Sequence, residues 1–462
     1  MEYSIITKDE VQTVIGEAEK TLHMCFELLL DLRHARDNMA NTLLTFQPLL
    51  AECLNELMTF YLKLQKEKNT LISRKVEFEH VTFAKAMRTN ALYSDAIKSV
   101  IEMGKDLGDA FAWYFFRNNR KELDKHFQHK STGLFTSGIG GLGELQFIKM
   151  CNRIDGCYVL YHGITSMLRI GDFSLYDFSN GTIMGVGEIK TKQIDDTLQI
   201  SAAITTTEKI STPSSIEKSQ SFTESINEIK KDFPKIEAQI KEQEDLFTNK
   251  ESGKLFDQYT SYDHAILDGL NPAAPVALNS DNSLMILANW SNYESLNEIL
   301  LNPEDFDIAE NELKQRVNSF MKPESSYNMV FIGELNTRIN MFGEPILWWH
   351  IDDKTCEDLY FKRMKITTMF NPAKVIQLFL DDGFCVIQAK KPKDFEIYKE
   401  LNDARIRVGT FEIISSFIQN NLMKTKDAYE STKHLLDAIN KGEIQQNTKI
   451  EMHIHLNSFG KE

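Results

Sequence analysis

One stretch of the sequence, residues 170–192, constrains the fold more than any other. It reads IGDFSLYDFSNGTIMGVGEIKTK, in which two runs of β-forming residues flank an Asn-Gly pair. An Asn-Gly pair between two such runs is a strong signal for a β-hairpin. Because an antiparallel hairpin brings its outer ends together, the sequence predicts that Asp172 lies close to Glu188 and Lys190.

The register of this hairpin decides whether the two carboxylates share a face. A two-residue loop would pair Asp172 with Ile189 and turn the two acids to opposite faces of the sheet. A three-residue loop would pair Asp172 with Glu188, and a β-bulge at Gly185 or Gly187 would restore the same pairing. We expect one of the last two arrangements.

Glu188 differs from the other Glu-x-Lys triplets of the chain in its apolar surroundings. Residues 228–230 and 312–314 have the same pattern, but they lie in polar stretches of helical periodicity. Glu188 instead follows a run of Ile, Met and Val that only glycines interrupt. A charge on a buried strand must be paired or bind a metal. The alternatives are therefore a metal site and a structural ion pair of Asp172, Glu188 and Lys190.

Composition favours a soluble cytoplasmic protein. The 462 residues are 42% hydrophobic and 26% charged, and no apolar run approaches the roughly 18 residues that span a membrane. Residues 1–11 lack the basic start and apolar core of a signal peptide. The six cysteines show no C-x-x-C spacing, which is typical of reduced thiols. We expect no membrane partner.

The net charge of −15 argues against a protein that coats nucleic acid by bulk electrostatics. The charge is uneven, because residues 101–200 hold 11 basic and 12 acidic residues, whereas residues 201–300 hold 8 basic and 16 acidic residues. The predicted hairpin therefore lies in a nearly neutral segment. An acidic nuclease remains consistent with this balance, since divalent cations offset local negative charge.

Residues 1–128 have the pattern of a helical region. Apolar residues recur at helical spacing in three segments, about 7–29 with Thr7 as its cap, 39–68 and 94–117. We expect a helical bundle with an aromatic core, and the alternative is an arm that forms dimers or binds a partner protein. His126 and His129 stand at a spacing suited to two metal ligands, but no third ligand lies nearby in the sequence.

A glycine-rich break precedes a helix expected at residues 143–152, which carries Glu144. Gly138, Gly140 and Gly143 match the dinucleotide pattern G-x-G-x-x-G by letters alone. The residues before them are not a strand, and no acid follows at about 20 residues, so this reading is disfavoured. A flexible entry to a helix, with backbone amides near a phosphate, fits the glycines better.

Further elements are expected along the rest of the chain. Strands are predicted at residues 156–164, 197–207, 283–290, 327–335 and 346–351, a charged helical insertion around 208–255, and helix again at 409–441. Trp348 and Trp349 would face opposite ways in a strand, one in the core and the other in the core or on a base-stacking surface. The basic run at residues 390–393 fits a solvated turn or a phosphate contact. His453 and His455 are expected on a final strand, not as ligands.

The order of a helix with Glu144, a strand, a strand with Asp172 and a strand with Glu188-x-Lys190 resembles the PD-(D/E)xK nuclease superfamily. The resemblance covers about 60 of the 462 residues. It implies an α+β or α/β fold in which a helical region, 1–128, precedes a restriction-endonuclease-like mixed sheet flanked by helices. The nuclease-like domain would span 129–400, and C-terminal helices with a final strand would span 401–462.

The resemblance also implies a chemistry for these residues. Asp172 and Glu188 would hold Mg²⁺, for which Mn²⁺ can substitute, with the Ile189 carbonyl as a third ligand; Glu144 would hold a second ion. Lys190 would orient or deprotonate the attacking water. The expected function is hydrolysis of phosphodiester bonds in nucleic acid, with DNA favoured, as an endonuclease of restriction or anti-phage defence. The alternative is an inactive nuclease-fold module that binds nucleic acid or serves as a scaffold.

Overall fold

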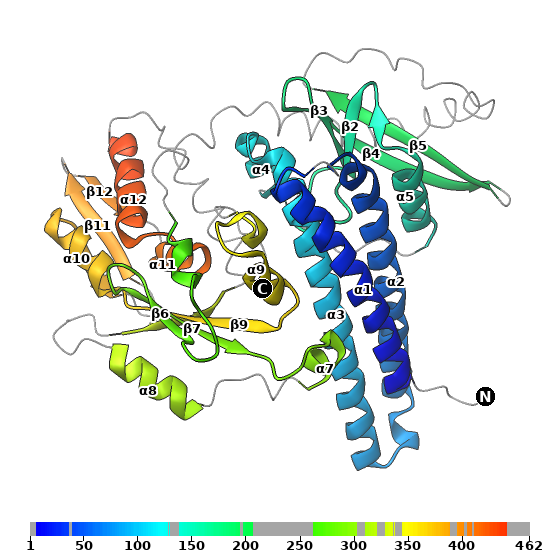
Figure 1. The fold of residues 1–462 in the computed structure, drawn as a ribbon, viewed down its shortest axis with the longest axis horizontal. Coiled ribbons are helices and arrows are strands. Elements are labelled where there is room, and N and C mark those ends of the chain that lie inside the picture. The colour runs from blue at the N-terminus through cyan, green and yellow to red at the C-terminus, as the bar shows by residue number, and fades with distance from the viewer. Residues whose placement is uncertain are drawn as a thin grey trace. The chain divides into compact units, whose positions relative to one another are not determined.

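The computed structural model divides the chain into two compact units (Figure 1). The first comprises Met1–Ser252 with Ser295–Leu301, and the second comprises Gly253–Glu294 with Asn302–Glu462. The structure describes residues 6–36, 39–127, 129, 138–194, 197–206, 262–302, 310–320, 329–335, 337, 344–388, 395–401, 404–408 and 411–440. The fold is α+β, with an N-terminal helical region followed by antiparallel sheets, which confirms the predicted class.

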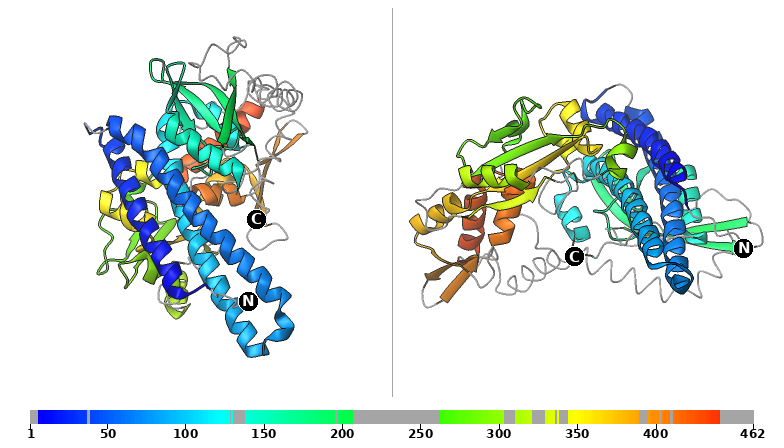
Figure 2. Two further views of the ribbon diagram at one scale, coloured as in Figure 1. Left: turned by 90° about the vertical axis from the view of Figure 1, so that its right-hand side faces the viewer. Right: turned by 90° about the horizontal axis from the view of Figure 1, so that it is seen from below.

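Three long helices open the first unit and pack side by side (Figure 2): α1 (Lys8–Arg33), α2 (Met39–Ser73) and α3 (His80–Phe116). The expected Thr7 cap is present as a capping box, in which Glu10 N–H donates to the Thr7 hydroxyl at 3.3 Å and Thr7 N–H to the Glu10 carboxylate at 2.7 Å. A short 3₁₀ turn, η1 (Lys75–Glu77), joins α2 to α3. Helix α3 begins at His80, earlier than the periodicity of apolar residues indicated. The first turns of this helix are only weakly amphipathic and contain few buried residues, so the sequence pattern did not reveal them.

A five-stranded antiparallel sheet follows the helices in the first unit. Its strands lie side by side in chain order: β1 (Arg153–Ile154), β2 (Cys157–Tyr161), β3 (Phe173–Asp177), β4 (Thr182–Ile194) and β5 (Thr197–Thr206). Two shorter helices, α4 (Arg120–Phe127) and α5 (Ile139–Met150), and the returning segment α7 (Leu296–Leu301) complete this unit. All pairings among the described strands are antiparallel, where the resemblance led us to expect a mixed sheet.

Helices cover both faces of this sheet. On one face, α5 approaches β4 so closely that a Cβ on Gly143 would lie 1.9 Å from the Thr191 hydroxyl. On the other face, the Phe115 ring of α3 stacks on the Tyr158 ring at 5.4 Å between centroids. The buried Gln47 side chain of α2 adds a polar connection, because its amide donates to the Val159 carbonyl of β2 at 2.8 Å.

The long helices and the sheet therefore share one core. This organisation differs from the sequence-based expectation of a domain boundary at residue 128. The physical reason is that β2 and β3 bury their apolar side chains against α3, so neither part has a complete core alone. The charged insertion expected around 208–255 lies outside the described residues.

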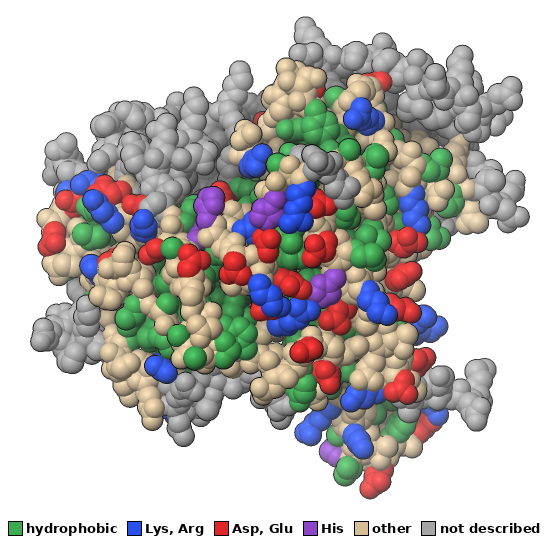
Figure 3. Space-filling model, viewed as in Figure 1, with side chains coloured by type: hydrophobic (Ala, Val, Ile, Leu, Met, Phe, Trp, Pro, Cys, Tyr) green, Lys and Arg blue, Asp and Glu red, His purple; other side chains and the backbone are tan. Residues whose placement is uncertain are grey.

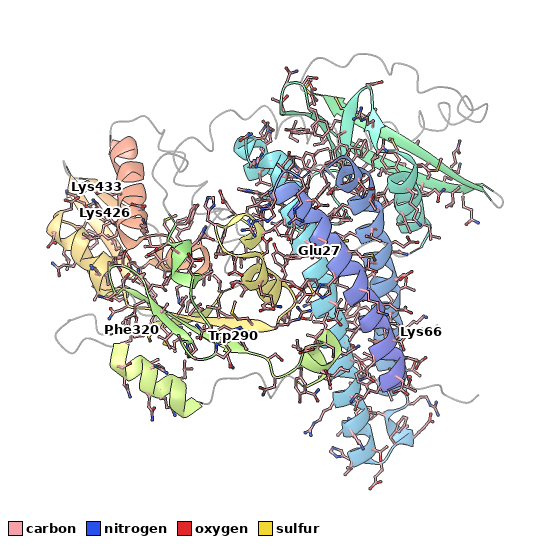
Figure 4. All side chains as sticks on the ribbon, viewed as in Figure 1. Glu27, Lys66, Trp290, Phe320, Lys426 and Lys433 are labelled. Atoms are coloured by element: carbon pink, nitrogen blue, oxygen red, sulfur yellow. The ribbon has the colours of Figure 1, made fainter. Side chains whose placement is uncertain are left out.

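The second unit contains two antiparallel sheets. The first has the order β6 (Val276–Leu278), β7 (Leu284–Trp290), β9 (Met364–Phe370) and β8 (Phe331–Glu334), and the second has β10 (Cys385–Gln388), β11 (Phe395–Leu401) and β12 (Ala404–Val408). The helices are α8 (Glu310–Phe320), α9 (Asp353–Tyr360), α10 (Ala373–Asp381), α11 (Phe411–Asn421) and α12 (Thr425–Asn440), with η2 (His264–Leu267) as a 3₁₀ turn. Phe320, labelled in Figure 4, packs with Met285, Leu287 and Met369 in a core of this unit.

The strand expected at residues 346–351 is wrong, because Ile346–Trp348 form the 3₁₀ turn η4 after Pro345. Trp349 is buried, its ring stacked on His264 at 4.1 Å, whereas Trp348 is half-buried. Apolar content produced the strand prediction, but a buried loop has the same composition. The basic run at 390–393 and the strand expected around 453–455 lie outside the described residues. Among the helices that the structure describes, none is long and apolar enough to span a membrane.

Candidate functional site

The β3–β4 hairpin reaches the predicted register by a bulge. At the turn, Asp177 pairs with Thr182, which leaves a loop of four residues where two or three were expected. Tyr176 then pairs with Ile183 and Leu175 with Gly185, so that Met184 is the extra residue of a β-bulge. The bulge lies next to Gly185, one of the two positions that the sequence indicated.

Beyond the bulge, Phe173 pairs with Gly187. Asp172 N–H donates to the Gly187 carbonyl at 2.7 Å, so the residue before β3 bonds to the same residue that pairs with Phe173. Extended by one residue, the register of Phe173 and Gly187 would pair Asp172 with Glu188, and this pairing stays a prediction.

The Asp172 carboxylate lies at the edge of β4, where it accepts a hydrogen bond from Ile189 N–H at 2.5 Å. The pKa of Asp172 is raised to about 7, mainly by burial; the charges of Glu188 and Glu144 contribute to the rise, whereas the Ile189 amide and Lys190 oppose it. Backbone N–H and C=O groups of one strand residue point to the same side, so the Ile189 carbonyl also faces the β3 edge. Glu188 and Glu144 are both close enough to Asp172 for their charges to act on its carboxyl group.

Glu188 and Lys190 contact each other on β4. The Lys190 ammonium lies 2.7 Å from a Glu188 carboxylate oxygen. The two side chains are 23% and 48% exposed, respectively, so solvent and a substrate can reach the lysine. The sequence left a structural ion pair of Asp172, Glu188 and Lys190 as an alternative. The observed contact joins two of these three residues.

Glu144 projects from α5 and accepts a hydrogen bond from the Tyr161 hydroxyl. Tyr161, at the end of β2, is only 1% exposed. Burial raises the pKa of this tyrosine well above its ordinary value, and the neighbouring Glu144 charge raises it further. Sequence reasoning missed Tyr161. Its signal was the strand register, since Tyr161 pairs with Phe173, next to Asp172.

The loop that leads into Asp172 is fixed by buried polar groups of α3 and α4. The buried Asp109 carboxylate of α3 accepts from Ser166 N–H at 2.7 Å and Met167 N–H at 3.0 Å, and also from the Ser166 hydroxyl. The Lys105 ammonium donates to the Thr165 carbonyl at 3.1 Å. Because these partners precede Asp172 by only a few residues, the helical region positions the site.

Histidines hold the same loop by backbone contacts. His126 Nδ1 accepts from the N–H groups of Arg169 and Ile170 at 2.9 and 3.1 Å. His162 Nδ1 lies 3.1 Å from the Gly171 carbonyl, and burial lowers its pKa to about 4. The His126 ring therefore has a structural role, and the sequence had already disfavoured His126 and His129 as metal ligands.

The glycine-rich break forms no nucleotide-binding loop in its described part. Gly138, with φ of +97°, immediately precedes α5, so Gly140 and Gly143 lie inside the helix. Gly143 is required for the close packing of α5 on Thr191. This packing, not phosphate binding, explains the third glycine.

The carboxylates fit a hard divalent cation in donor type and charge, although their present arrangement is not a complete ligand set. In the described part of the chain, no three His, Cys, Asp or Glu side chains are grouped so that they could hold a metal ion. The pKa of Asp172 is raised mainly by burial, and the charges of two neighbouring acids add an electrostatic penalty. A cation would remove this penalty, and carboxylate oxygens are the ligands that Mg²⁺ prefers.

Comparisons of the chain with protein-family models, with curated protein sequences and with solved structures found no match.

Proposed function

We propose that the protein is a metal-dependent nuclease that hydrolyses phosphodiester bonds of nucleic acid, with DNA as the favoured substrate. The observation that carries the proposal is that the charges of Glu188 and Glu144 both act on the Asp172 carboxyl group, next to the pair of Phe173 and Gly187 at the end of the hairpin. Grouped carboxylates with one raised pKa and an adjacent exposed lysine are the residue types that such a reaction needs.

Asp172, Glu188 and the Ile189 carbonyl would hold one Mg²⁺ or Mn²⁺, and Glu144 would hold a second. When bound, the metal would stabilise negative charge on the phosphate and lower the pKa of the attacking water. The Ile189 amide fixes the orientation of the Asp172 carboxylate. The Lys190 ammonium would place a positive charge beside the phosphate and orient the water.

The wider setting is also a proposal. Restriction or anti-phage defence in the cytoplasm follows from the resemblance of the site motifs. The surface of the long helices carries intermingled acidic and basic side chains (Figure 3) and would serve for a homo-oligomer or a partner protein.

Cleavage of plasmid, linear duplex and single-stranded DNA, with and without Mg²⁺, tests the proposal. We expect Asp172→Ala, Glu188→Ala and Lys190→Ala each to abolish Mg²⁺-dependent cleavage while the circular dichroism spectrum stays unchanged. Lys192→Ala is the matched control, because Lys192 lies on the same strand two residues further on and should leave cleavage intact. Undiminished cleavage by all three site variants would show that the reaction occurs elsewhere.

A second measurement needs no activity. Because a bound cation relieves the repulsion among the acids, Mg²⁺ should raise the melting temperature of the unmodified protein at pH 8. The Asp172→Asn variant has lost one negative ligand and should respond much less. Equal shifts in both proteins would place the cation elsewhere.

The alternative is a nuclease-fold module without activity that binds nucleic acid or serves as a scaffold. Two observations favour it: Glu188 already contacts Lys190, and no complete ligand set is formed among the described residues. Binding of DNA without cleavage at any Mg²⁺ or Mn²⁺ concentration would select this alternative.

A further inference from the structure

A cluster of aromatic rings reaches the surface at the β3–β4 turn. Phe178, the first residue of this turn, is 43% exposed, and no other aromatic residue whose exposure the structure describes is as accessible. Its ring centroid lies 5.2 Å from that of Tyr176, 5.7 Å from Tyr158 and 6.2 Å from Phe115. The Phe178 ring therefore packs against three other rings, and part of it is exposed to solvent.

The turn that carries Phe178 is held firmly. The Asn119 side-chain amide donates to the Gly181 carbonyl at 3.0 Å, and Gly181 N–H donates to the Asp177 carbonyl at 2.8 Å. The Asp177 carboxylate accepts from Ser179 N–H at 2.8 Å. A ligand that stacks on Phe178 would therefore lose little binding free energy to ordering of the loop.

A cation lies on the same cluster. The Arg117 guanidinium carbon is 4.8 Å from the centroid of the Tyr114 ring, and this ring contacts Phe115 edge to face at 5.3 Å. Arg117 is exposed, so its charge is available to an anion in solvent. Exposed aromatic rings beside arginine are the elements that bind single-stranded nucleic acid, because every base has a stacking face and every nucleotide a phosphate.

We propose that Phe178 and Tyr176 form a stacking platform for an unpaired base of single-stranded nucleic acid, with Arg117 in contact with the backbone phosphate. The inference rests on the proposed nuclease function and specifies its substrate as one with a single-stranded segment. Phe178 lies six positions after Asp172 along β3. At the rise of a strand this is about 20 Å, so the bound base would lie several nucleotides from the cleaved bond.

A protein surface is the less suitable occupant. A protein contact needs a broad apolar patch, whereas the platform offers one exposed ring and the half-buried Tyr176. The flat face of one base matches this area. The neighbouring positive charge suits a phosphate.

Fluorescence anisotropy with labelled oligo-dT and oligo-rU of about 12 nucleotides tests the platform. EDTA is present to suppress metal-dependent cleavage, and the two oligonucleotides distinguish DNA from RNA. We expect Phe178→Ala to weaken binding about tenfold or more, because stacking is lost. Phe178→Trp should retain the affinity, and oligonucleotide should quench the added tryptophan emission. Met24→Ala on α1 is the matched control, since Met24 is 51% exposed and lies outside the cluster.

Several results would overturn the platform: no oligonucleotide binding by the unmodified protein, equal binding by Phe178→Ala, or unquenched emission in Phe178→Trp. A shift of Phe178→Ala to a smaller species in size-exclusion chromatography, with unchanged oligonucleotide affinity, would instead assign the ring to a contact between protein copies. Cleavage that depends on Asp172 but not on Phe178 would leave the nuclease proposal standing and remove the platform. Binding that depends on Phe178, without cleavage in the presence of any metal, would support the platform and remove the nuclease proposal.

Discussion

The buried carboxylate of Asp109 and the half-buried carboxylate of Asp172, both in the first unit, have different surroundings. Asp109 accepts hydrogen bonds from two backbone amides and one hydroxyl, so its oxygens are well satisfied. Asp172 accepts from one amide and faces the charges of Glu144 and Glu188. The first arrangement stabilises a loop, whereas the second is costly unless a cation or a proton is bound. Burial raises the pKa of both carboxyl groups, so the feature that indicates a binding site is the pair of nearby acid charges, which act on Asp172 and not on Asp109.

The pKa of Asp172 predicts a pH-dependent stability. Because the folded-state pKa of about 7 exceeds the unfolded value, the folded protein holds a proton that the unfolded chain has lost. This stabilisation is complete below about pH 4 and disappears as the pH rises through about 7. Replacing Asp172 with Asn removes the titration but keeps an acceptor for the Ile189 amide.

We therefore expect Asp172→Asn to gain stability relative to the unmodified protein as the pH rises. Between pH 4.5 and pH 8, the difference in their unfolding free energies should change by about 1–3 kcal/mol in favour of the variant. Urea unfolding at several pH values in EDTA measures it. A difference that does not change with pH would mean that Asp172 titrates normally in the folded state.

Asp109 gives a prediction of the opposite kind. Asp109→Ala leaves the amides of Ser166 and Met167 without their acceptor in a buried site and should lower stability by about 2–4 kcal/mol. Asp109→Asn keeps one acceptor oxygen and should lower it much less. Chemical denaturation compares the two variants, and equal losses would show that the carboxylate charge, not the hydrogen bonding, matters.

At the scale of elements, β4 organises the first unit. It pairs with β3 on one edge and β5 on the other, and α5 packs on its face. The contact between Gly143 and Thr191 sets the distance from α5 to the sheet and so places Glu144. A larger residue at this point would push the helix, and with it one of the three acids, away from the site.

We expect Gly143→Ala to lower the unfolding free energy by about 1–3 kcal/mol, because the new methyl group overlaps Thr191. Adding Thr191→Gly should recover part of this loss. Gly16→Ala in α1 is the control, since its Cβ would meet only Asn297 Nδ2, at 3.4 Å, and alanine favours a helix interior by up to about 1 kcal/mol. A stable Gly143→Ala variant with unchanged Mg²⁺ response would show that α5 can shift without effect on the site.

At the scale of the molecule, the helices and the five-stranded sheet form one folding unit. Gln47 of α2 bonds to the Val159 carbonyl and accepts from Tyr161 N–H at 2.7 Å, while Lys105 and Asp109 of α3 bond to the loop before Asp172. Buried polar connections of this kind, satisfied on both sides, couple two layers into one cooperative structure. The helical region is thus not a detachable arm.

A chain that lacks residues 1–128 should consequently fail to form the sheet. We expect residues 129–462 to lose the near-ultraviolet circular dichroism of the first unit and to be cleaved by trypsin within the segment of β2 to β5. Full-length protein digested under the same conditions is the control. Protection of that segment in the shortened chain would show that the sheet folds independently.

Several elements could be predicted from local sequence alone. The Thr7 cap, the long helices and the β3–β4 hairpin follow from side-chain periodicity, capping and turn chemistry, which act over a few residues. The 3₁₀ turn at Ile346–Trp348 could not be predicted, because apolar composition does not distinguish a strand from a buried loop.

For the candidate site, the sequence by itself determined that a hairpin joins the segments that carry Asp172 and Glu188, whereas the chemistry of these residues stays a prediction. Only the tertiary structure decided the rest: the bulge at Met184, the Tyr161 contact to Glu144, and the loop anchors on α3 and α4. These contacts join residues that lie far apart in the chain. Their pairing depends on how whole elements pack, and no local pattern of residues records it.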